Sequence, residues 1–258
     1  MCLIVIGWRA HPEYPLVVAA NRDEFLARPA SPAHWWPDAP SILAGRDLEA
    51  GGTWMGITRS GRFAALTNYR DPTVRRPGAP SRGALVRDCL STPDKVTATL
   101  ERVAQVSAGY PGFNLLVSDG TELGIHESMT GSVRLLDAGI YGLSNHLLDT
   151  PWPKVRLARE RFEAAMTRLP AEDGFLNLLC DDIAAPDEHL PATGVSADWE
   201  RWLSPAFIRA PGYGTRCTTL LLVRNDGSTR LRELTWEDDG RISSEVIHSF
   251  AISRKTVC

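Results

Sequence analysis

The chain begins with two short apolar runs that are separated only by a polar, proline-containing turn. Leu3–Trp8 and Leu16–Asn21 lie on either side of Pro12, so this part of the sequence predicts a β-hairpin. A second pair of runs, Gly52–Thr58 and Arg62–Asn68, surrounds a Ser-Gly turn in the same way. Strands joined by short turns pair antiparallel, because a parallel pair needs a crossover of a dozen or more residues. The sequence therefore favours antiparallel sheets over a doubly wound parallel fold.

Three further stretches have apolar residues at helical spacing. They are Pro93–Val106, Pro153–Arg168, which has the clearest pattern, and Gly174–Ile183. Other runs are predicted strands: Asn114–Ser118, Glu122–Glu127, Val133–Leu136, Ile140–Ser144, Thr218–Val223, Arg230–Trp236 and Ile242–Phe250. Strands that follow one another before helices begin predict an α+β fold, and two antiparallel sheets between helix layers accommodate all these elements.

Two proline-containing segments lack this patterning. Arg28–Pro40 predicts an irregular loop, and Pro191–Gly214 predicts a long irregular segment of the kind that often forms a lid or a binding loop. No repeat, low-complexity block or Gly/Ser linker divides the chain, and 258 residues fit one large domain. We therefore expect residues 1–258 to form a single domain.

The charge balance argues against a nucleic-acid partner. The chain has 28 Lys and Arg against 31 Asp and Glu, a net charge of −3, so it has no bulk attraction for phosphate backbones. No apolar run approaches the ~18–20 residues that span a bilayer, and the apolar start lacks the basic residues of a signal peptide. We expect neither a transmembrane segment nor a signal peptide.

The five cysteines are scattered and form no CxxC pair, which indicates neither a disulfide framework nor a zinc site. An odd number of unpaired thiols fits a reducing compartment, so we expect a cytoplasmic protein. His126-Glu127 resembles half of a metal motif, but no second ligand stands at the required spacing. We therefore expect no metal and no cofactor.

Cys2 is the first candidate for chemistry. An initiator Met is usually removed when the second residue is small, and removal of Met1 would leave Cys2 with a thiol and a free α-amine. Because an α-amine has a pKa of ~7.7–8.0, a useful fraction is neutral near pH 7 and can accept the thiol proton. The alternative interpretation of Cys2 is a small buried residue at the start of a strand.

Polar side chains also mark the ends of several predicted strands. Asn21-Arg22-Asp23-Glu24 closes the second run, and the first hairpin places it beside Cys2, where a carboxylate can hold a protonated amine. Asn68 and Asn145 end two other runs and could bind an oxyanion, while Arg216 precedes a strand and would lower the pKa of a nearby thiol. For each residue alone, a solvated strand end, a turn Asn or a surface Arg is the alternative.

Taken together in order, six blocks resemble the NRDE-domain family, also called the transport and Golgi organisation protein two family. The resemblance covers nearly the whole chain, from Cys2 to Thr219. The blocks are Met1-Cys2, Asn21-Arg22-Asp23-Glu24, Gly52-Thr53-Trp54-Met55-Gly56, Thr67-Asn68-Tyr69-Arg70, Leu143-Ser144-Asn145 and Tyr213-Gly214-Thr215-Arg216.

That family in turn resembles the N-terminal nucleophile hydrolases of the choloylglycine hydrolase and penicillin V acylase group, which implies a four-layer αββα sandwich. The resemblance implies that Cys2 is the nucleophile, that Asp23 contacts its amine, and that Arg216 stands near the thiol. By the same resemblance, Asn68 and Asn145 supply oxyanion and amine contacts. The hydrolases carry an Arg just before the Asn-x-Asp stretch, where this chain has Ala20.

The sequence thus predicts an N-terminal cysteine hydrolase or acyltransferase that acts on a linear amide or acyl substrate. We expect Asn21, Arg22, Trp54 and Tyr69 to bind the substrate. The alternative is a non-catalytic carrier or chaperone for an apolar ligand such as haem or an acyl lipid, with Trp and Pro-rich loops as the walls of the cleft. A structural adaptor is a third interpretation. Retention of Met1, which an intact mass would show, favours the carrier.

Overall fold

The central strands of the first sheet come from the two ends of the chain. In the computed structural model, which describes residues 2–73 and 78–253, this sheet has the order β10-β1-β2-β12-β13-β14, and a short β11 pairs with β12. All neighbouring strands of this sheet run antiparallel to each other. The strands are β1 (Cys2–Trp8), β2 (Leu16–Phe25), β10 (Gly139–Leu143), β11 (Arg209–Ala210), β12 (Tyr213–Val223), β13 (Ser228–Trp236) and β14 (Ile242–Ala251).

The second sheet is an antiparallel meander in which strand order follows chain order, from β3 to β9. Its strands are β3 (Ala30–Trp36), β4 (Ala39–Asp47), β5 (Met55–Thr58), β6 (Phe63–Asn68), β7 (Phe113–Ser118), β8 (Leu123–Glu127) and β9 (Ser132–Leu135). The irregular loop predicted for Arg28–Pro40 is wrong, because this segment contains β3 and the start of β4. Pro32 is tolerated there because β3 is an edge strand and its pairing with β4 is interrupted by register shifts.

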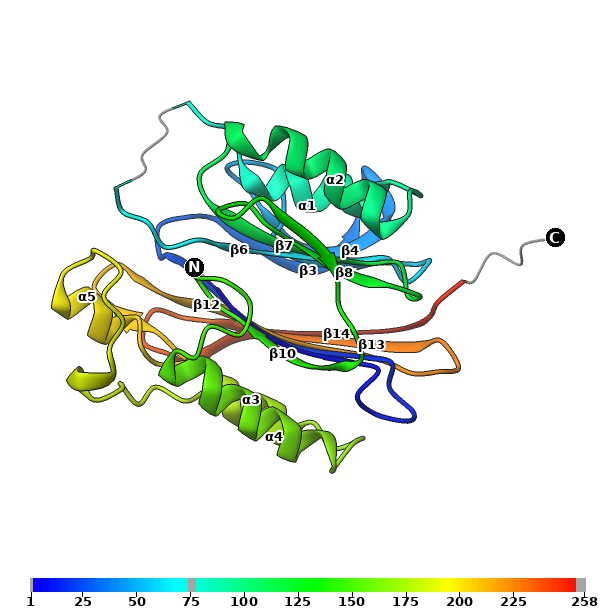
Figure 1. Cartoon of the computed structure of the whole chain (residues 1–258). Coiled ribbons are helices and arrows are strands. Elements are labelled where there is room, and N and C mark those ends of the chain that lie inside the picture. Colours follow the sequence, from blue (N-terminus) through cyan, green and yellow to red (C-terminus); the bar gives the residue numbers. More distant parts are fainter. Residues whose placement is uncertain (1, 74–77, 254–258) are drawn as a thin grey trace.

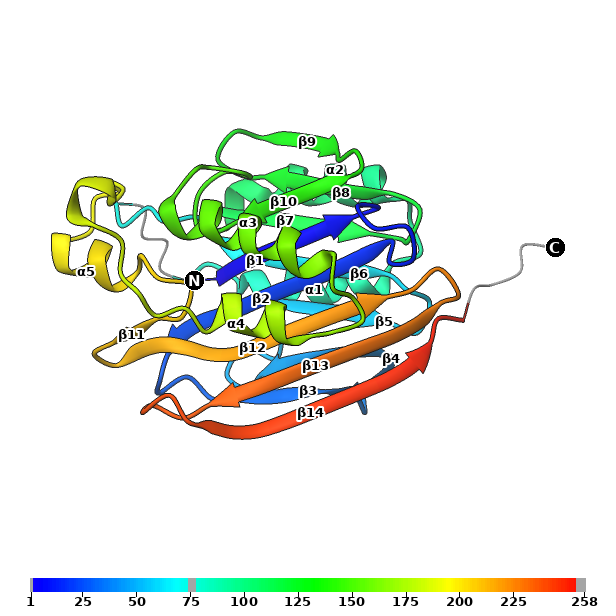
Figure 2. The same ribbon diagram turned by 90° about the horizontal axis from the view of Figure 1, so that it is seen from below.

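Helices cover the outer face of each sheet, as Figures 1 and 2 show. Over the second sheet lie α1 (Arg82–Ser91) and α2 (Val96–Val106), and over the first lie α3 (Pro153–Met166) and α4 (Asp173–Leu179). Short helices η1 (Ser107–Gly109), η2 (Asp187–His189) and α5 (Ala197–Trp202) complete the helical elements of the described chain. The predicted α+β fold, a four-layer αββα sandwich of two antiparallel sheets, is confirmed.

Two helices were not expected from the sequence. α1 has no apolar periodicity as clear as that of α3, yet it buries Leu85, Val86, Cys89 and Leu90 against the second sheet. α5 lies inside the segment predicted to be irregular, and Ser196 caps it by accepting a hydrogen bond from the backbone N–H of Trp199. α5 lies near the end of the sandwich at which β1 begins (Figure 1).

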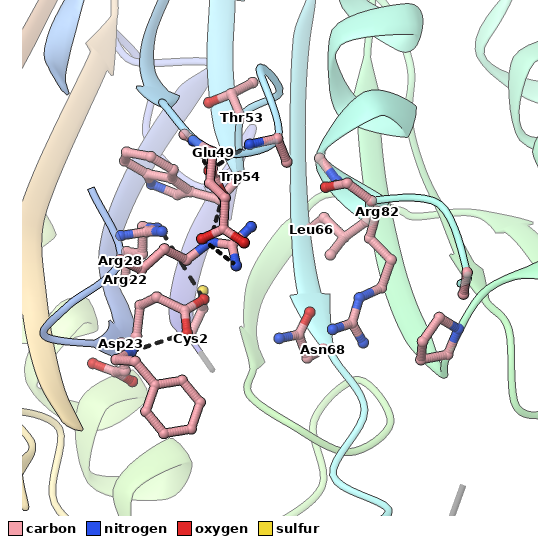
Figure 3. A pocket seen from close by; sticks show the side chains of 18 of the residues that line it. Cys2, Arg22, Asp23, Arg28, Glu49, Thr53, Trp54, Leu66, Asn68 and Arg82 are labelled. Atoms are coloured by element: carbon pink, nitrogen blue, oxygen red, sulfur yellow. Dashed lines mark hydrogen bonds and ion pairs between the residues drawn. The ribbon is translucent and has the colours of Figure 1, made fainter. Parts of the chain in front are cut away.

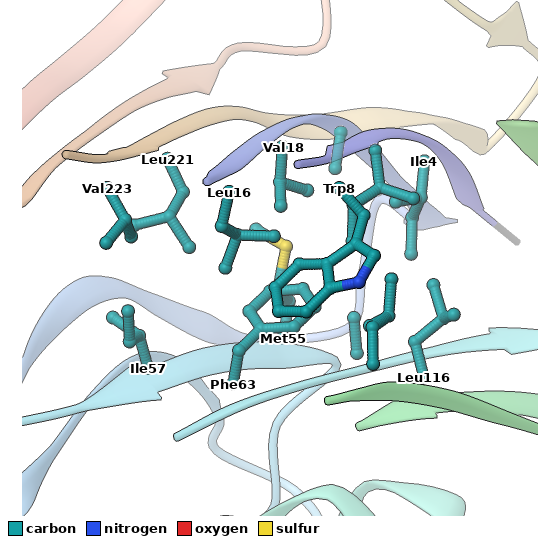
Figure 4. Close-up of a cluster of buried hydrophobic side chains, with 14 of the residues drawn as sticks. Ile4, Trp8, Leu16, Val18, Met55, Ile57, Phe63, Leu116, Leu221 and Val223 are labelled. Carbon is teal, nitrogen blue, oxygen red and sulfur yellow. The ribbon is translucent and has the colours of Figure 1, made fainter. Parts of the chain in front are cut away.

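The core between the sheets orients the residues at the start of β1 and the end of β2. Apolar side chains such as Ile4, Val18 and Phe63 fill this layer (Figure 4). Because side chains alternate along a strand, Cys2 points to the same face as Ile4, and Arg22 points to the same face as Ala20. Two polar side chains thus face the second sheet where the apolar layer ends.

Within the described residues, no helix is long and apolar enough to cross a membrane. The longest helix, α3, has 14 residues, of which several are charged and exposed. A bilayer-spanning helix needs roughly 20 predominantly apolar residues.

Candidate active site

A cavity of about 660 Å³ lies at the end of the sandwich where β1 begins and β2 and β6 end. Cys2, Arg22 and Asp23 line it from the first sheet, and Trp54 and Asn68 line it from the second. Figure 3 shows Arg22 and Trp54 on one side of Cys2, with Asn68 on the other. Of the nine residues predicted to form the site, these five therefore share one cavity.

The Cys2 thiol is largely buried, and its surroundings set its acidity. Burial is the largest influence and raises its pKa, and the charge of Asp23 acts in the same direction. The charge of Arg22 and the hydrogen bond from the backbone N–H of Asp23 lower the pKa. Ser144 Oγ donates to the Cys2 carbonyl at 3.1 Å and fixes the backbone. Because burial dominates, a nucleophilic Cys2 needs a base beside it.

Asp23 lies behind Cys2, on the opposite face of the sheet from Arg22. Its Oδ1 accepts a hydrogen bond of 2.7 Å from Thr215 Oγ1, and its backbone carbonyl accepts one of 2.8 Å from Tyr213. Burial raises the pKa of the Asp23 carboxyl, and the charge of Lys154 is the strongest influence that lowers it. The carboxyl is thus held in place with a buried cation nearby.

Lys154 is a site residue that the sequence did not reveal. It lies at the start of α3, is buried, and donates from Nζ to the carbonyl of Leu203 at 2.9 Å. Burial lowers its pKa to about 8, and the charge of Asp23 acts against that shift. No sequence signal separates this lysine from an exposed helical one, because its burial comes from the packing of the segment around Leu203 over α3.

Asn68 and Asn145 occupy different places in the site. Asn68 lines the cavity, whereas Asn145 is fully buried behind it and donates from Nδ2 to the Asn68 carbonyl at 2.9 Å. Ser144 Oγ lies 3.3 Å from Asn145 Oδ1 and hydrogen-bonds to it. The structure thus places Asn68 where it can contact a ligand and Asn145 where it can position Asn68.

Arg216, which the resemblance implies near the thiol, is not among the residues that line the cavity around Cys2. It is the extra residue of a β-bulge between Thr215 and Cys217, and its Nη1 lies 3.3 Å from Asp238 Oδ1. The arginine whose charge acts on the Cys2 thiol is Arg22. A bulge shifts the register by one residue, and no residue pattern in this strand indicates it.

Asn21 and Tyr69, both expected to bind substrate, lie outside the cavity wall. The Asn21 side chain is buried and donates to the carbonyls of Leu179 and Ala206 at 2.7 and 2.9 Å, so it ties β2 to α4 and to the segment that follows α5. The Tyr69 ring packs against His146, with centroids 4.9 Å apart. Both contacts stabilise the walls of the site.

Arg22 and Trp54 form a stacked pair on the cavity wall. The guanidinium of Arg22 lies 4.5 Å from the Trp54 ring centroid, and its Nη2 lies 4.0 Å from Glu24 Oε2. Stacking on an aromatic face suits a guanidinium that is removed from water. The placement of this pair allows both residues to contact a ligand.

The four-layer fold is similar to that of a hydrolase of known structure. A solved structure of the C2A mutant of the conjugated bile acid hydrolase from Clostridium perfringens covers 100% of both chains with a TM-score of 0.51 at 10% sequence identity. At this identity the likeness concerns the fold alone.

The chain belongs to the Transport and Golgi organisation 2 family, whose family model matches residues 1–238. It is 35% identical to the Transport and Golgi organization protein 2 homolog of Homo sapiens, over 92% of this chain and 94% of that protein. It is 29% identical to Transport and Golgi organization protein 2 of Drosophila melanogaster, over 91% and 92% of the two chains. The family expected from the sequence is confirmed.

Proposed function

We propose that this protein is an N-terminal cysteine hydrolase or acyltransferase that acts on a linear amide or acyl substrate. The observation that carries the proposal is the meeting of Cys2, Asn68 and Arg22 in one cavity, with the Asp23 carboxyl behind Cys2. A nucleophile, a hydrogen-bond donor for an oxyanion and an adjacent carboxylate are the groups that acyl transfer requires.

In the proposed mechanism, removal of Met1 frees the α-amine of Cys2, and the Asp23 carboxylate holds this amine. The neutral amine takes the proton from Sγ, and the sulfur attacks the substrate carbonyl, forming a C–S bond. The Asn68 side-chain amide donates to the oxyanion. Collapse breaks the C–N bond, and the leaving amine takes the proton from the α-ammonium group.

The resulting thioester is released in a second step. Water, or another acceptor in acyl transfer, loses a proton to the α-amine and attacks the thioester carbonyl. A C–O bond forms, the C–S bond breaks, and the sulfur recovers the proton. The raised thiol pKa explains why the mechanism relies on an adjacent base rather than on a preformed thiolate.

A carrier for an apolar ligand, such as haem or an acyl lipid, is the second candidate. It is favoured by an aromatic wall at the cavity, where Phe25 is 60% exposed and packs edge-on against Tyr213 with centroids 5.2 Å apart. A carrier uses this wall without needing a thiolate. The raised pKa of the Cys2 thiol is compatible with that role.

Hydrolysis of a panel of acyl amides with fluorogenic leaving groups distinguishes the two candidates. The wild-type chain is expected to release the fluorophore, and Cys2→Ala is expected to fall to the background rate. Cys180→Ala is the matched control, because Cys180 is an exposed free cysteine outside the cavity and should leave turnover unchanged. Equal hydrolysis by Cys2→Ala and wild type would contradict the proposal.

A further inference from the structure

Arg22 carries a buried donor that the described residues leave unpaired. Its side chain is only 5% exposed, and Nη1 has no hydrogen-bond partner among the residues that the structure describes. Its contact with Glu24 is long, at 4.0 Å, and Glu24 Oε1 also accepts from the backbone N–H of Phe25. A desolvated guanidinium donor that lacks an acceptor lowers the stability of the folded chain. A ligand acceptor at Nη1 would remove this penalty, so the donor is suited to bind a ligand.

Arg82 adds a second cation on the other side of Cys2. It is the first residue of α1, lines the cavity, and lies beside Asn68 in Figure 3. Among the described residues its guanidinium makes one hydrogen bond, from Nη1 to the Gly112 carbonyl at 3.0 Å. Ser81 and Gly83 line the same wall, so the positive end of the α1 dipole also faces the cavity.

The remaining arginine of the cavity is already neutralised. Arg28 lies 2.7 Å from Asp47 and 3.4 Å from Glu49, and all three line the cavity. These ion pairs engage two of the four acidic residues of the wall; the other two are Asp23 and Glu24, of which Glu24 lies 4.0 Å from Arg22 Nη2. Among the described residues, Arg82 forms no ion pair and Arg22 Nη1 has no hydrogen-bond partner, so both guanidinium groups can still contact an anion.

An apolar surface adjoins these cations. Phe25, Trp199 and Tyr213 line the cavity, and the Trp199 and Tyr213 ring centroids are 5.9 Å apart. Because Phe25 is largely exposed, an apolar chain laid against it would remove aromatic surface from water. The cavity thus offers a cationic part and an aromatic part.

We propose that the cavity binds an amphipathic acyl compound whose anionic head group contacts Arg22 and Arg82 and whose apolar chain lies against Phe25, Trp199 and Tyr213. The proposal deepens the proposed function, on which it rests for the position of the acyl carbonyl beside Cys2. A carboxylate and a phosphate share the required chemistry, since both accept paired guanidinium hydrogen bonds.

Calorimetric titration of the Cys2→Ala variant tests binding without turnover. The probes are N-dodecanoylglycine, its uncharged methyl ester, dodecyl phosphate and N-acetylglycine, each below its micelle-forming concentration. We expect the acid to bind at least ten-fold more tightly than the ester and than N-acetylglycine. A similar affinity for dodecyl phosphate indicates that any such anion suffices, and weaker binding indicates a carboxylate site.

Arginine variants in the same background locate the head group. Arg82→Gln is expected to abolish the preference for the acid over the ester, and Arg82→Lys to keep part of it. Arg87→Gln is the matched control, because Arg87 lies on the same helix but is exposed and paired with Asp88. It should leave the preference unchanged.

Equal affinity for acid and ester in Cys2→Ala would overturn the proposal, whether or not any arginine variant folds. So would an Arg87→Gln effect as large as that of Arg82→Gln, or the absence of binding by all probes. Because binding is measured without the nucleophile, these outcomes are independent of whether the wild-type chain hydrolyses amides.

Discussion

The side-chain amide of Asn145 donates a 2.9 Å hydrogen bond to the backbone carbonyl of Asn68, and this bond joins the two sheets beside Cys2. Asn145 follows β10, the neighbour of β1, whereas Asn68 ends β6 of the other sheet. The backbone N–H of Arg70 returns a 2.8 Å bond to the Asn145 carbonyl. The position of Asn68 relative to Cys2 is therefore set from the sheet that carries Cys2.

Asn68→Ala is expected to lower kcat by about 10²–10³-fold with little change in KM, because it removes the oxyanion donor. Asn145→Ala is expected to lower kcat less, and to cost about 1–3 kcal/mol of stability because the Asn68 carbonyl loses its partner. Steady-state kinetics and denaturant unfolding of both variants and of the double variant check this. Fully additive effects on kcat would show that Asn145 does not act through Asn68.

Asp23→Asn is expected to abolish most hydrolase activity while the chain still folds. The Asn side chain keeps an acceptor for Thr215 Oγ1 but cannot hold the ammonium form of the Cys2 amine.

Since burial raises the pKa of Asp23, the favourable contribution of its carboxyl to stability is fully present at low pH and is lost as the carboxyl ionises. The stability of the wild type relative to Asp23→Asn should therefore decline as pH rises above about 4. Urea unfolding at several pH values measures this, and an unfolded variant would assign Asp23 a structural role only.

Lys154→Met is expected to move the acidic limb of the pH profile of kcat/KM to higher pH. The charge of Lys154 lowers the pKa of Asp23, so its removal leaves the carboxyl harder to ionise. Lys95→Met is the control, because Lys95 is exposed at the start of α2. An unshifted limb in Lys154→Met would mean that Asp23 does not govern it.

Lys154 also gives a stability signal of defined sign. Its pKa of about 8 lies below the ordinary lysine value of about 10.4, so between these values the unfolded chain binds the extra proton. The free energy of unfolding of the wild type, measured against Lys154→Met, should thus rise with pH across this window. A difference in the free energy of unfolding that does not change with pH would contradict a lowered pKa of Lys154 in the folded chain.

Gly52→Ala is expected to destabilise the chain by about 1–3 kcal/mol and to weaken ligand binding. A Cβ at Gly52 would stand 2.4 Å from the carbonyl carbon of Gly83, so the added methyl group would push the start of α1, and Arg82 with it, out of place. Gly109→Ala is the control, because a Cβ there meets nothing within 4 Å. Thermal unfolding of both variants checks the prediction, and equal melting temperatures would show that the backbone adjusts.

Local patterning accounts for much of the fold that the sequence predicted. The first hairpin, the helix at Pro153 and the last strands have clear apolar periods and turn residues, and the structure contains them as β1, β2, α3 and β12–β14. The β3–β4 hairpin is not predicted by the sequence, because its proline and paired tryptophans are typical of loops. β3 forms because it pairs with β4 at the edge of the second sheet, where a proline is tolerated.

Part of the site is also predictable from the positions at which the strands end. Cys2, Asp23 and Asn68 stand at strand ends, and neighbouring strand ends meet at one edge of a sandwich. A β-bulge decides which face Arg216 joins, and tertiary packing alone brings Lys154 near Asp23 and Arg82 to the cavity, so the sequence does not reveal these placements.

Peptide-mapped mass spectrometry of the wild-type chain, quenched in acid after brief exposure to an activated acyl amide, shows directly whether Cys2 is the nucleophile. We predict a chain that begins at Cys2 and carries one acyl group on that residue, removable by hydroxylamine as a thioester is, with Cys180 unmodified. Retention of Met1 with no acyl group on Cys2, or acylation of Cys180 in preference to Cys2, would contradict a nucleophilic role of Cys2.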